Sequence, residues 1–211
     1  MQRLEKTTLF YETLANSPRL RDFDRRFGTP ARDIWEFLIA TAGDEQLILM
    51  RGKFAEMGME PRLARADAQR LNHAGLTILG DERAAVAFLN PTTAFAGALG
   101  PVERLAENRN EGAGVPASLQ SLISQIPSEN EIWFASVGPP PSLLPVAKVA
   151  RAWGGIDPVK RSIDFHVEME TDLEAKTVAD ILGGKQNSNR VDLNGPIPPR
   201  VLDWLSNQSG Q

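Results

Sequence analysis

The sequence predicts an α+β protein with mostly antiparallel sheets, helices on one face of them, and a helical N-terminal segment. Three observations support this class. Short apolar runs of strand character follow one another between residues 76 and 98, too closely for helical crossovers. Other segments repeat apolar residues at helical spacing, and turn residues separate the two kinds of segment. Because the predicted strands cluster, α+β is favoured over alternating α/β.

The N-terminal segment is predicted to be helical. Serine or threonine precedes proline at residues 17–18 and 29–30, which places a capping side chain before a proline suited to the first helical position. The second helix is expected to end at Gly43. Its apolar residues are Ile34, Trp35, Phe37, Leu38 and Ile39. Residues 47–54 then form an apolar run, predicted to be a central strand covered on both faces.

The region before residue 112 is predicted to contain a helix, three strands and a second helix. Pro61 begins the first helix, which is expected to reach about Leu71. The three strands are expected at residues 76–79, 84–89 and 92–98. Gly100-Pro101 starts the second helix, after which residues 112–117 form a glycine-containing linker.

The second half of the chain alternates helices and strands. Helices are expected at residues 119–126, after Ser142 to about Trp153, and from Thr171 to Leu182; strands are expected at residues 131–138 and 162–170. Thr171 and Glu174 have the spacing of a capping box, in which the two side chains satisfy free backbone amides at the helix start. The sequence after Lys185 is polar and rich in turn residues, so it is predicted to be a tail with a short docking helix at residues 201–205.

These elements give two α+β units. The first is expected to span residues 1–111 with its helical segment, followed by a linker at 112–117, a second unit at 118–186 and a polar tail at 187–211. In each unit an apolar strand is followed by a helix that begins at a proline or a serine cap. This order is compatible with two split βαβ, ferredoxin-like units.

Four segments carry a resemblance to a family. RGKF at residues 51–54, GLTILG at 75–80, AVAFLNPTTAFAG at 85–97 and EIWFASVG at 131–138 occur in this order. Over residues 18–185 the chain resembles uncharacterised bacterial proteins of acidobacterial type. The resemblance implies an α+β fold and no activity. Those relatives carry an export signal and an initial strand that this sequence lacks.

Composition and charge disfavour several classes of function. The chain has 23 Lys and Arg against 27 Asp and Glu, and the net charge of -4 works against binding nucleic acid. It has no cysteine, which excludes disulfides and thiolate chemistry. No apolar stretch approaches the roughly 20 residues that cross a bilayer, and the N-terminus lacks the form of a secretory signal. A soluble, cytoplasmic protein is expected, or a periplasmic or secreted one if a signal peptide was removed.

The sequence predicts no catalytic residues, no metal site and no cofactor, because the common phosphate-binding, nucleophile and zinc motifs are absent. One strand face is a candidate ligand site. Alternation places Asp164, His166 and Glu168 on the same face, about 7 Å apart at successive positions. This face is either the solvated side of a sheet or a place where carboxylates flank an imidazole. A shared metal would need a ligand from another strand.

A second candidate lies at the end of the apolar run. Arg51 and Lys53 flank Gly52, where two cations on a strand suit an anion, although such residues also occur at the solvated rim of a sheet. The preferred hypothesis is a non-catalytic interaction or structural module. Self-association through an exposed sheet edge is a separate, third hypothesis. The alternative is a small-molecule or metal-binding enzyme, hydrolase-like, that uses Asp164, His166 and Glu168.

Overall fold

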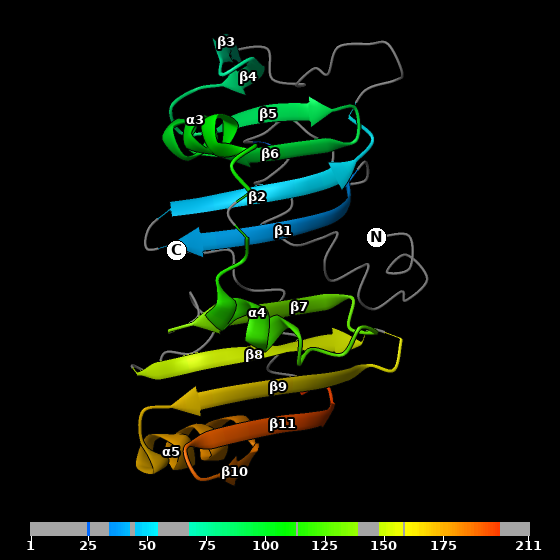
Figure 1. The fold of residues 1–211 in the computed structure, drawn as a ribbon. Coiled ribbons are helices and arrows are strands. Elements are labelled where there is room, and N and C mark those ends of the chain that lie inside the picture. The colour runs from blue at the N-terminus through cyan, green and yellow to red at the C-terminus, as the bar shows by residue number, and fades with distance from the viewer. Residues whose placement is uncertain are drawn as a thin grey trace. The chain divides into compact units, whose positions relative to one another are not determined.

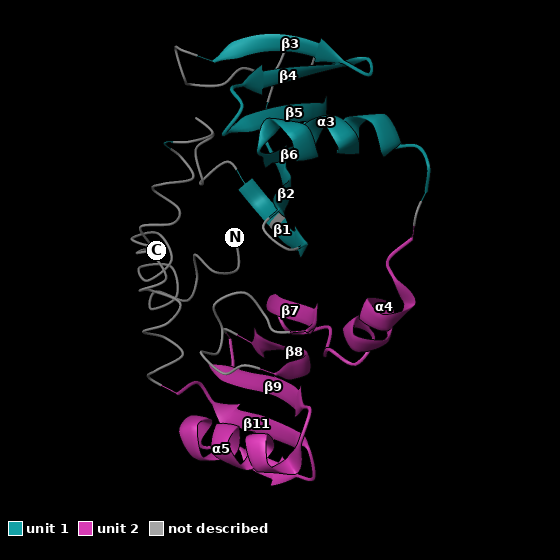
Figure 2. Cartoon of the chain, turned by 90° about the vertical axis from the view of Figure 1, so that its left-hand side faces the viewer, with its two compact units in different colours: residues 1–113, 204–211 teal, residues 114–203 magenta. Residues whose placement is uncertain are grey.

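The computed structural model describes two antiparallel sheets and three helices, labelled in Figure 1. The described residues are Arg25 and the ranges 34–42, 45–54, 68–112, 114–138, 148–157 and 159–198. The α+β class is confirmed at this level. The predicted helices before residue 30 and at 201–205 lie outside the described residues. The chain falls into two compact units that divide between residues 113 and 114, shown in different colours in Figure 2.

Unit 1 contains a six-stranded sheet in the order β1-β2-β6-β5-β4-β3, with every neighbouring pair antiparallel. The strands are β1 (Ile34–Ala42), β2 (Glu45–Gly52), β3 (Gln69–His73), β4 (Leu76–Gly80), β5 (Ala85–Asn90) and β6 (Thr93–Gly97). Helix α3 (Leu99–Asn108) follows β6 and lies over the sheet near β5 and β6 (Figure 1). The three short strands predicted between residues 76 and 98, and the helix after Gly100, are confirmed.

The central strands of unit 1 are buried on both faces. On the face of α3, Val102 and Ala106 pack in one cluster with Phe95. On the opposite face, Met50 and Val86 belong to a second buried cluster. Full burial of each large side chain contributes about 1.5–3 kcal/mol.

Three predictions in unit 1 are wrong. Ile34–Ala42 forms strand β1 instead of a helix, because β-branched and aromatic residues fit the antiparallel pairing with β2. The helix predicted to reach Leu71 does not, since Gln69–His73 is strand β3. Strand β2 is present but is not covered on both faces, because only Met50 and Gly52 are buried in it. Pairing with distant strands overrides local propensity at these places.

Unit 2 contains a five-stranded sheet in the order β10-β11-β9-β8-β7, again antiparallel throughout. Its elements are α4 (Ala117–Ile123), β7 (Ile132–Val137), β8 (Val149–Asp157), β9 (Ser162–Met169), α5 (Asp172–Leu182), β10 (Lys185–Asn187) and β11 (Arg190–Pro196). The helices at 119–126 and 171–182 and the strands at 131–138 and 162–170 are thus confirmed, with shifts at their ends. None of the helices in the described ranges is long and apolar enough to cross a membrane.

Helix α5 begins and ends as its sequence predicts. The Thr171 hydroxyl accepts a hydrogen bond from the Glu174 backbone amide at 3.3 Å. The Glu174 carboxylate accepts from the Thr171 hydroxyl, rather than from the Thr171 backbone amide as a full capping box requires. Gly183 ends the helix in the left-handed conformation, with φ 72°. One apolar face of α5, including Val178, packs in a cluster with Val167 and Val191.

Helix α5 also makes a crossover. It connects β9 to β10, and β11 lies between these two strands in the sheet. The two split βαβ, ferredoxin-like units stay a prediction.

Two predictions in unit 2 are wrong. Val149–Asp157 is strand β8, where a helix was predicted to continue from Ser142 to Trp153. Gly154 allows strands β8 and β9 to approach closely, because a Cβ there would lie 2.1 Å from the Asp164 carbonyl oxygen. The polar tail predicted from residue 187 is incorrect as well, because Arg190–Pro196 forms strand β11 inside the sheet. Hydrogen bonds to β9 stabilise this polar segment as a strand.

Candidate functional site

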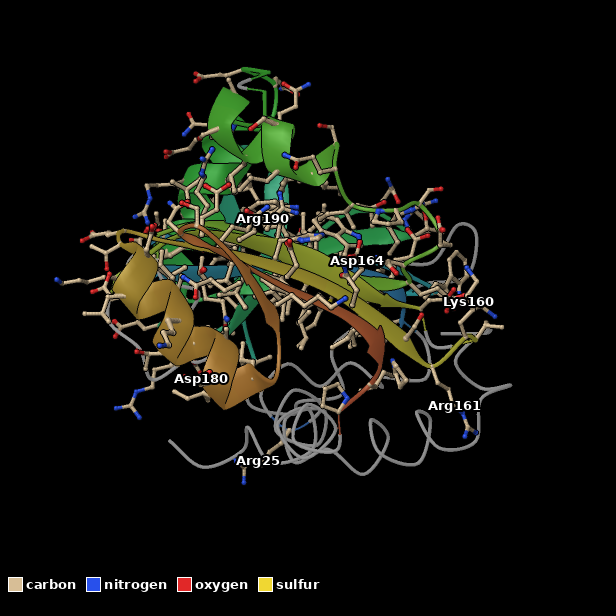
Figure 3. All side chains as sticks on the ribbon, turned by 90° about the horizontal axis from the view of Figure 1, so that it is seen from below. Arg25, Lys160, Arg161, Asp164, Asp180 and Arg190 are labelled. Carbon is tan, nitrogen blue, oxygen red and sulfur yellow. The ribbon has the colours of Figure 1, made fainter. Side chains whose placement is uncertain are left out.

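The predicted strand face exists on β9. Asp164, His166 and Glu168 alternate with Val167, which packs on the side of α5, so the three polar side chains lie on the other side of the sheet. Neighbouring strands add side chains to this side, because directly paired residues share a face. We call the group the polar face: it comprises Arg151 and Trp153 of β8, Asp164, His166 and Glu168 of β9, and Arg190, Asp192 and Asn194 of β11. Asp164 and Arg190 are labelled in Figure 3.

His166 is the centre of the polar face. Its Nε2 lies 3.1 Å from Asp164 Oδ1. Its Nδ1 lies 2.6 Å from Asp192 Oδ1 and 2.8 Å from an Arg190 guanidinium nitrogen, Nη2. Only 12% of the His166 side chain is exposed. Both ring nitrogens are therefore occupied by groups from β9 and β11.

Trp153 packs beside these groups, as the cross-strand partner of His166 in the β8–β9 pair. It is 2% exposed, and its ring lies 5.2 Å from the His166 ring, centroid to centroid, at a tilt of 34°. The Arg190 guanidinium carbon lies 5.1 Å from the centroid of the Trp153 ring, a cation–π geometry. Within the described part of the chain, the buried indole nitrogen of Trp153 has no hydrogen-bond partner. Strands β8, β9 and β11 are thus connected through stacked side chains.

Asp192 is held in its charged form. Burial of the carboxyl group favours the neutral form, but hydrogen bonds from His166 and Arg190 and the attraction of their charges outweigh burial, so the pKa of Asp192 is lowered from its ordinary value. Arg190 Nε donates to the same carboxylate oxygen at 2.6 Å. Asp192 is therefore an anionic acceptor in contact with both Arg190 and His166.

Glu168 is engaged separately. Arg151 Nε donates to Glu168 Oε2 at 2.8 Å, and the two residues are cross-strand partners. The structure therefore brings all three predicted residues of β9 onto one face, but each has a polar partner there. Among the described residues, no group of three or more His, Asp or Glu side chains has a geometry suited to a metal ion. The side chains of the polar face join neighbouring strands. Both ring nitrogens of His166, through which a general base would act, already have polar contacts within the protein.

Arg51 and Lys53 lie in unit 1, in the other sheet. Arg51 donates to Glu36 on β1 at 3.0 Å, and both side chains are exposed. Lys53 is exposed after the end of β2. Buried Gly52 donates its amide hydrogen to the Thr92 carbonyl oxygen at 3.0 Å, which joins the end of β2 to the β5–β6 turn. A carboxylate thus already occupies one of the two cations of the predicted anion site.

The edge strands of each sheet are a second kind of candidate surface. In unit 1, edge strand β1 exposes Leu38 (46%) and Ile39 (45%). The opposite edge, β3, has the sequence QRLNH. In unit 2, edge strand β7 exposes Trp133 and Val137, whereas the opposite edge, β10, is only KQN. Each sheet therefore has one polar edge and one apolar edge in the described part of the chain.

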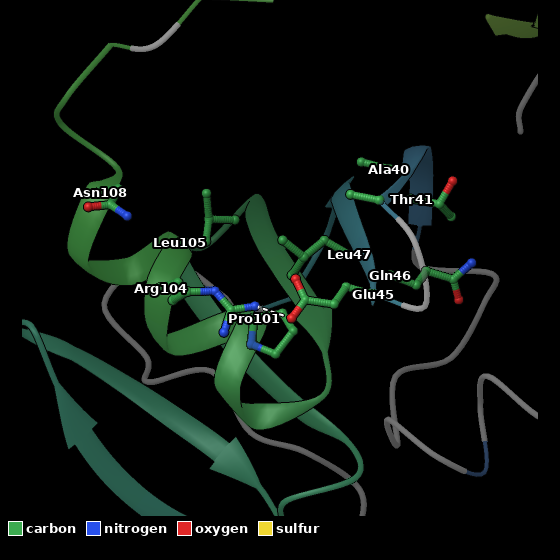
Figure 4. Close-up of a pocket in the computed structure, with 10 residues that line it drawn as sticks. Ala40, Thr41, Glu45, Gln46, Leu47, Pro101, Arg104, Leu105 and Asn108 are labelled. Carbon is green, nitrogen blue, oxygen red and sulfur yellow. Dashed lines mark hydrogen bonds and ion pairs between the residues drawn. The ribbon is translucent and has the colours of Figure 1, made fainter. Parts of the chain in front are cut away.

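A shallow hollow of about 310 Å³ lies beside β1, between the start of β2 and helix α3 (Figure 4). Ala40 and Leu47 line it from the strands, and Leu105 lines it from α3. An ion pair between Arg104 and Glu45 lies at its side. Its lining is mostly apolar, which extends the exposed apolar surface of β1 toward α3.

Sequence reasoning missed the three residues that complete the polar face. The sequence predicts Trp153 at the end of a helix, and it predicts Arg190 and Asp192 in a polar tail. A signal for β11 was present: Arg190, Asp192 and Asn194 alternate with the apolar Val191 and Leu193, which is the period of a half-buried strand. The glycines, asparagines and prolines around this segment masked the alternation.

Comparison with known proteins identifies a similar fold and does not indicate a function. No model of a known protein family matches the sequence, and no curated protein matches it. The crystal form I structure of TP0453 has 11% identity and a TM-score of 0.52, and the match covers 94% of this chain and 88% of that chain. Crystal form IV of TP0453 has 10% identity, a TM-score of 0.47, and coverage of 95% and 88%. At this identity, the likeness to crystal form I shows the fold alone.

Proposed function

We propose that this chain is a non-catalytic interaction module that pairs with a second copy of itself along edge strand β1. The observation that supports the proposal most is the exposure of Leu38 and Ile39, close to half of each side chain, on a nine-residue edge strand. An edge strand presents unpaired backbone donors and acceptors to any strand that comes alongside. Long apolar edges are rare on proteins that stay single.

The contrast with β3 supports this proposal. Natural sheets protect their edges with short strands, charged side chains or proline. Strand β3 has five residues, including Arg70, and at most one exposed large apolar side chain, Leu71. Strand β1 has nine residues, no proline and no lysine. The same sheet therefore has one edge built against pairing and one edge without those protections.

The charge pattern of β1 favours a second copy as the partner. Glu36 is the one charged residue in the strand. In an antiparallel pair centred on Leu38, Glu36 of one copy lies opposite Ala40 of the other. Like charges do not meet, and Leu38 of one copy lies opposite Leu38 of the other, a favourable cross-strand pair. The symmetry is that of an isologous dimer, the commonest form of self-association.

Self-association is tested by sedimentation of the full chain over a range of concentrations. The edge variant replaces Leu38 and Ile39 together by lysine, and the matched control is Leu71→Lys on β3, at the other edge of the same sheet. We expect the native chain and the control to dimerise alike and the edge variant to dimerise at least about tenfold more weakly, equivalent to about 1.4 kcal/mol. A native chain that stays monomeric at every concentration overturns the proposal, as does a control that weakens dimerisation equally.

The alternative function is a small-molecule or metal-binding enzyme, hydrolase-like, that uses Asp164, His166 and Glu168. One observation favours it: a carboxylate that bonds to an imidazole nitrogen, as Asp192 does to His166, orients a general base. The support is weaker because the ring is mostly buried and its other nitrogen faces Asp164. Metal analysis of the purified protein and a ligand panel on His166→Ala distinguish the two. A metal-free protein whose binding profile is unchanged by His166→Ala removes the alternative.

A further inference from the structure

The Nδ1 atom of His166 has two neighbours that make opposite demands on it. Asp192 Oδ1, at 2.6 Å, is a charged carboxylate oxygen and can only accept a hydrogen bond. Arg190 Nη2, at 2.8 Å, belongs to a guanidinium group and can only donate one. A ring nitrogen either carries a proton and donates, or lacks it and accepts. Nδ1 therefore cannot bond to both residues in one protonation state.

We infer that protonation of His166 switches its Nδ1 hydrogen bond between two residues of β11, from Arg190 when the ring is neutral to Asp192 when it is charged. In the neutral state, Nε2 carries the proton and lies 3.1 Å from Asp164 Oδ1, while Nδ1 accepts from Arg190. In the charged state, both ring nitrogens carry protons, and Nδ1 donates to Asp192. The inference concerns unit 2 and is independent of pairing through β1.

In the described part of the chain, charged groups from three strands surround the ring. On β8, Arg151 lies one cross-strand row away and bonds to Glu168 of β9. On β9, Asp164 contacts Nε2 in both states. On β11, Arg190 and Asp192 contact Nδ1. Two carboxylates contact the ring and can accept hydrogen bonds from it, and one guanidinium contacts the ring and can only donate.

The switch has a consequence at the surface of the sheet. In the charged state, Arg190 keeps two of its contacts, the bond from its Nε to Asp192 and its position over Trp153. Its Nη2 loses the imidazole acceptor. Because the Arg190 side chain is 35% exposed, that N–H can then bond to an acceptor from outside. The polar face thus offers an additional donor at acidic pH and withdraws it when the ring is neutral.

The test reads the proton positions directly. The chain has two histidines, so His73→Gln leaves His166 as the single one. Nitrogen NMR of this ¹⁵N-histidine-labelled chain, recorded across about pH 5 to 8, distinguishes the two neutral tautomers from the doubly protonated ring. We expect the neutral ring to carry its proton on Nε2 and the ring at low pH to carry protons on both nitrogens. A neutral ring with its proton on Nδ1, or a ring in one protonation state throughout, overturns the inference.

Two further variants in the same background test the role of Arg190. Arg190→Met removes the donor to Nδ1 and keeps the apolar stem, so the neutral ring is expected to move its proton to Nδ1 and donate to Asp192. Arg151→Met is the matched control, because Arg151 bonds to Glu168 and makes no hydrogen bond with His166 in the structure. Its neutral ring is expected to keep the Nε2 proton. The same tautomer in both variants contradicts the switch, and the tautomer of the native ring remains a test if Arg190→Met fails to fold.

Discussion

The two sheets differ in what lies on their faces. In unit 1, the central strands β5 and β6 are buried on both faces, with Phe95 toward α3 and Val86 on the other side. In unit 2, α5 covers an apolar face, and the other face carries charged side chains around His166, which packs beside Trp153. The difference teaches where each unit is vulnerable. The stability of unit 1 depends on close packing of apolar side chains. The stability of unit 2 depends also on the close approach of the β8 and β9 backbones at Gly154 and on the ion pairs around His166.

Phe95→Ala in unit 1 is expected to have the largest effect. The side chain is 1% exposed and packs with Ile78 and Val102, so truncation leaves a cavity that costs about 3–5 kcal/mol. Chemical denaturation followed by circular dichroism measures the loss, and amide NMR signals report whether unit 2 stays folded. A loss of stability below about 1 kcal/mol would contradict the description of the central strands of unit 1 as closely packed on both faces.

Gly154→Ala tests the backbone approach in unit 2. Gly154 has φ 146°, and an added Cβ would lie 2.1 Å from the Asp164 carbonyl oxygen and 2.7 Å from the Phe165 Cα. A side chain at such a φ costs about 1–3 kcal/mol, and the contact with β9 backbone adds to the cost. The matched control is Gly114→Ala, where a Cβ meets nothing within 4 Å. Denaturation should show little change for the control, within about 0.5 kcal/mol. Equal stability of the two variants would disprove the close approach.

Asp192→Asn tests the pairing of charges and is expected to have the smallest effect, about 1 kcal/mol at neutral pH, because the side chain is partly exposed. The native pKa of Asp192 is lowered, since hydrogen bonds from His166 and Arg190 outweigh burial, which alone would raise it. Its contribution is therefore complete above the ordinary value of 3.8 and is lost as the pH falls through the folded value.

Urea unfolding of the native chain and of Asp192→Asn at a series of pH values measures this dependence. The difference in unfolding free energy between the two chains is expected to shrink as the pH falls below the ordinary value of 3.8. A difference that stays constant down to the lowest pH at which the chain folds would show that the charge of Asp192 does not stabilise the polar face.

Much of the candidate site could be predicted from β9 alone. Ile163 to Met169 alternates strictly, so the shared face of Asp164, His166 and Glu168 followed from the period of a strand. The partners could not be predicted in the same way. Asp192 is 26 residues from His166 in sequence, and only the register of β11 against β9 places them directly opposite each other. Without that register, the charge state and the contacts of the imidazole were open.

What the sequence alone determined is local. The cap of α5 at Thr171, its end at Gly183 and the short strands between residues 76 and 98 depend on neighbours within a few positions, so their residues suffice to specify them. What only the tertiary structure decided is pairing. Residues 34–42, 149–157 and 190–196 became strands because backbone groups of distant segments satisfy theirs, and hydrogen bonds of that range leave little trace in local sequence.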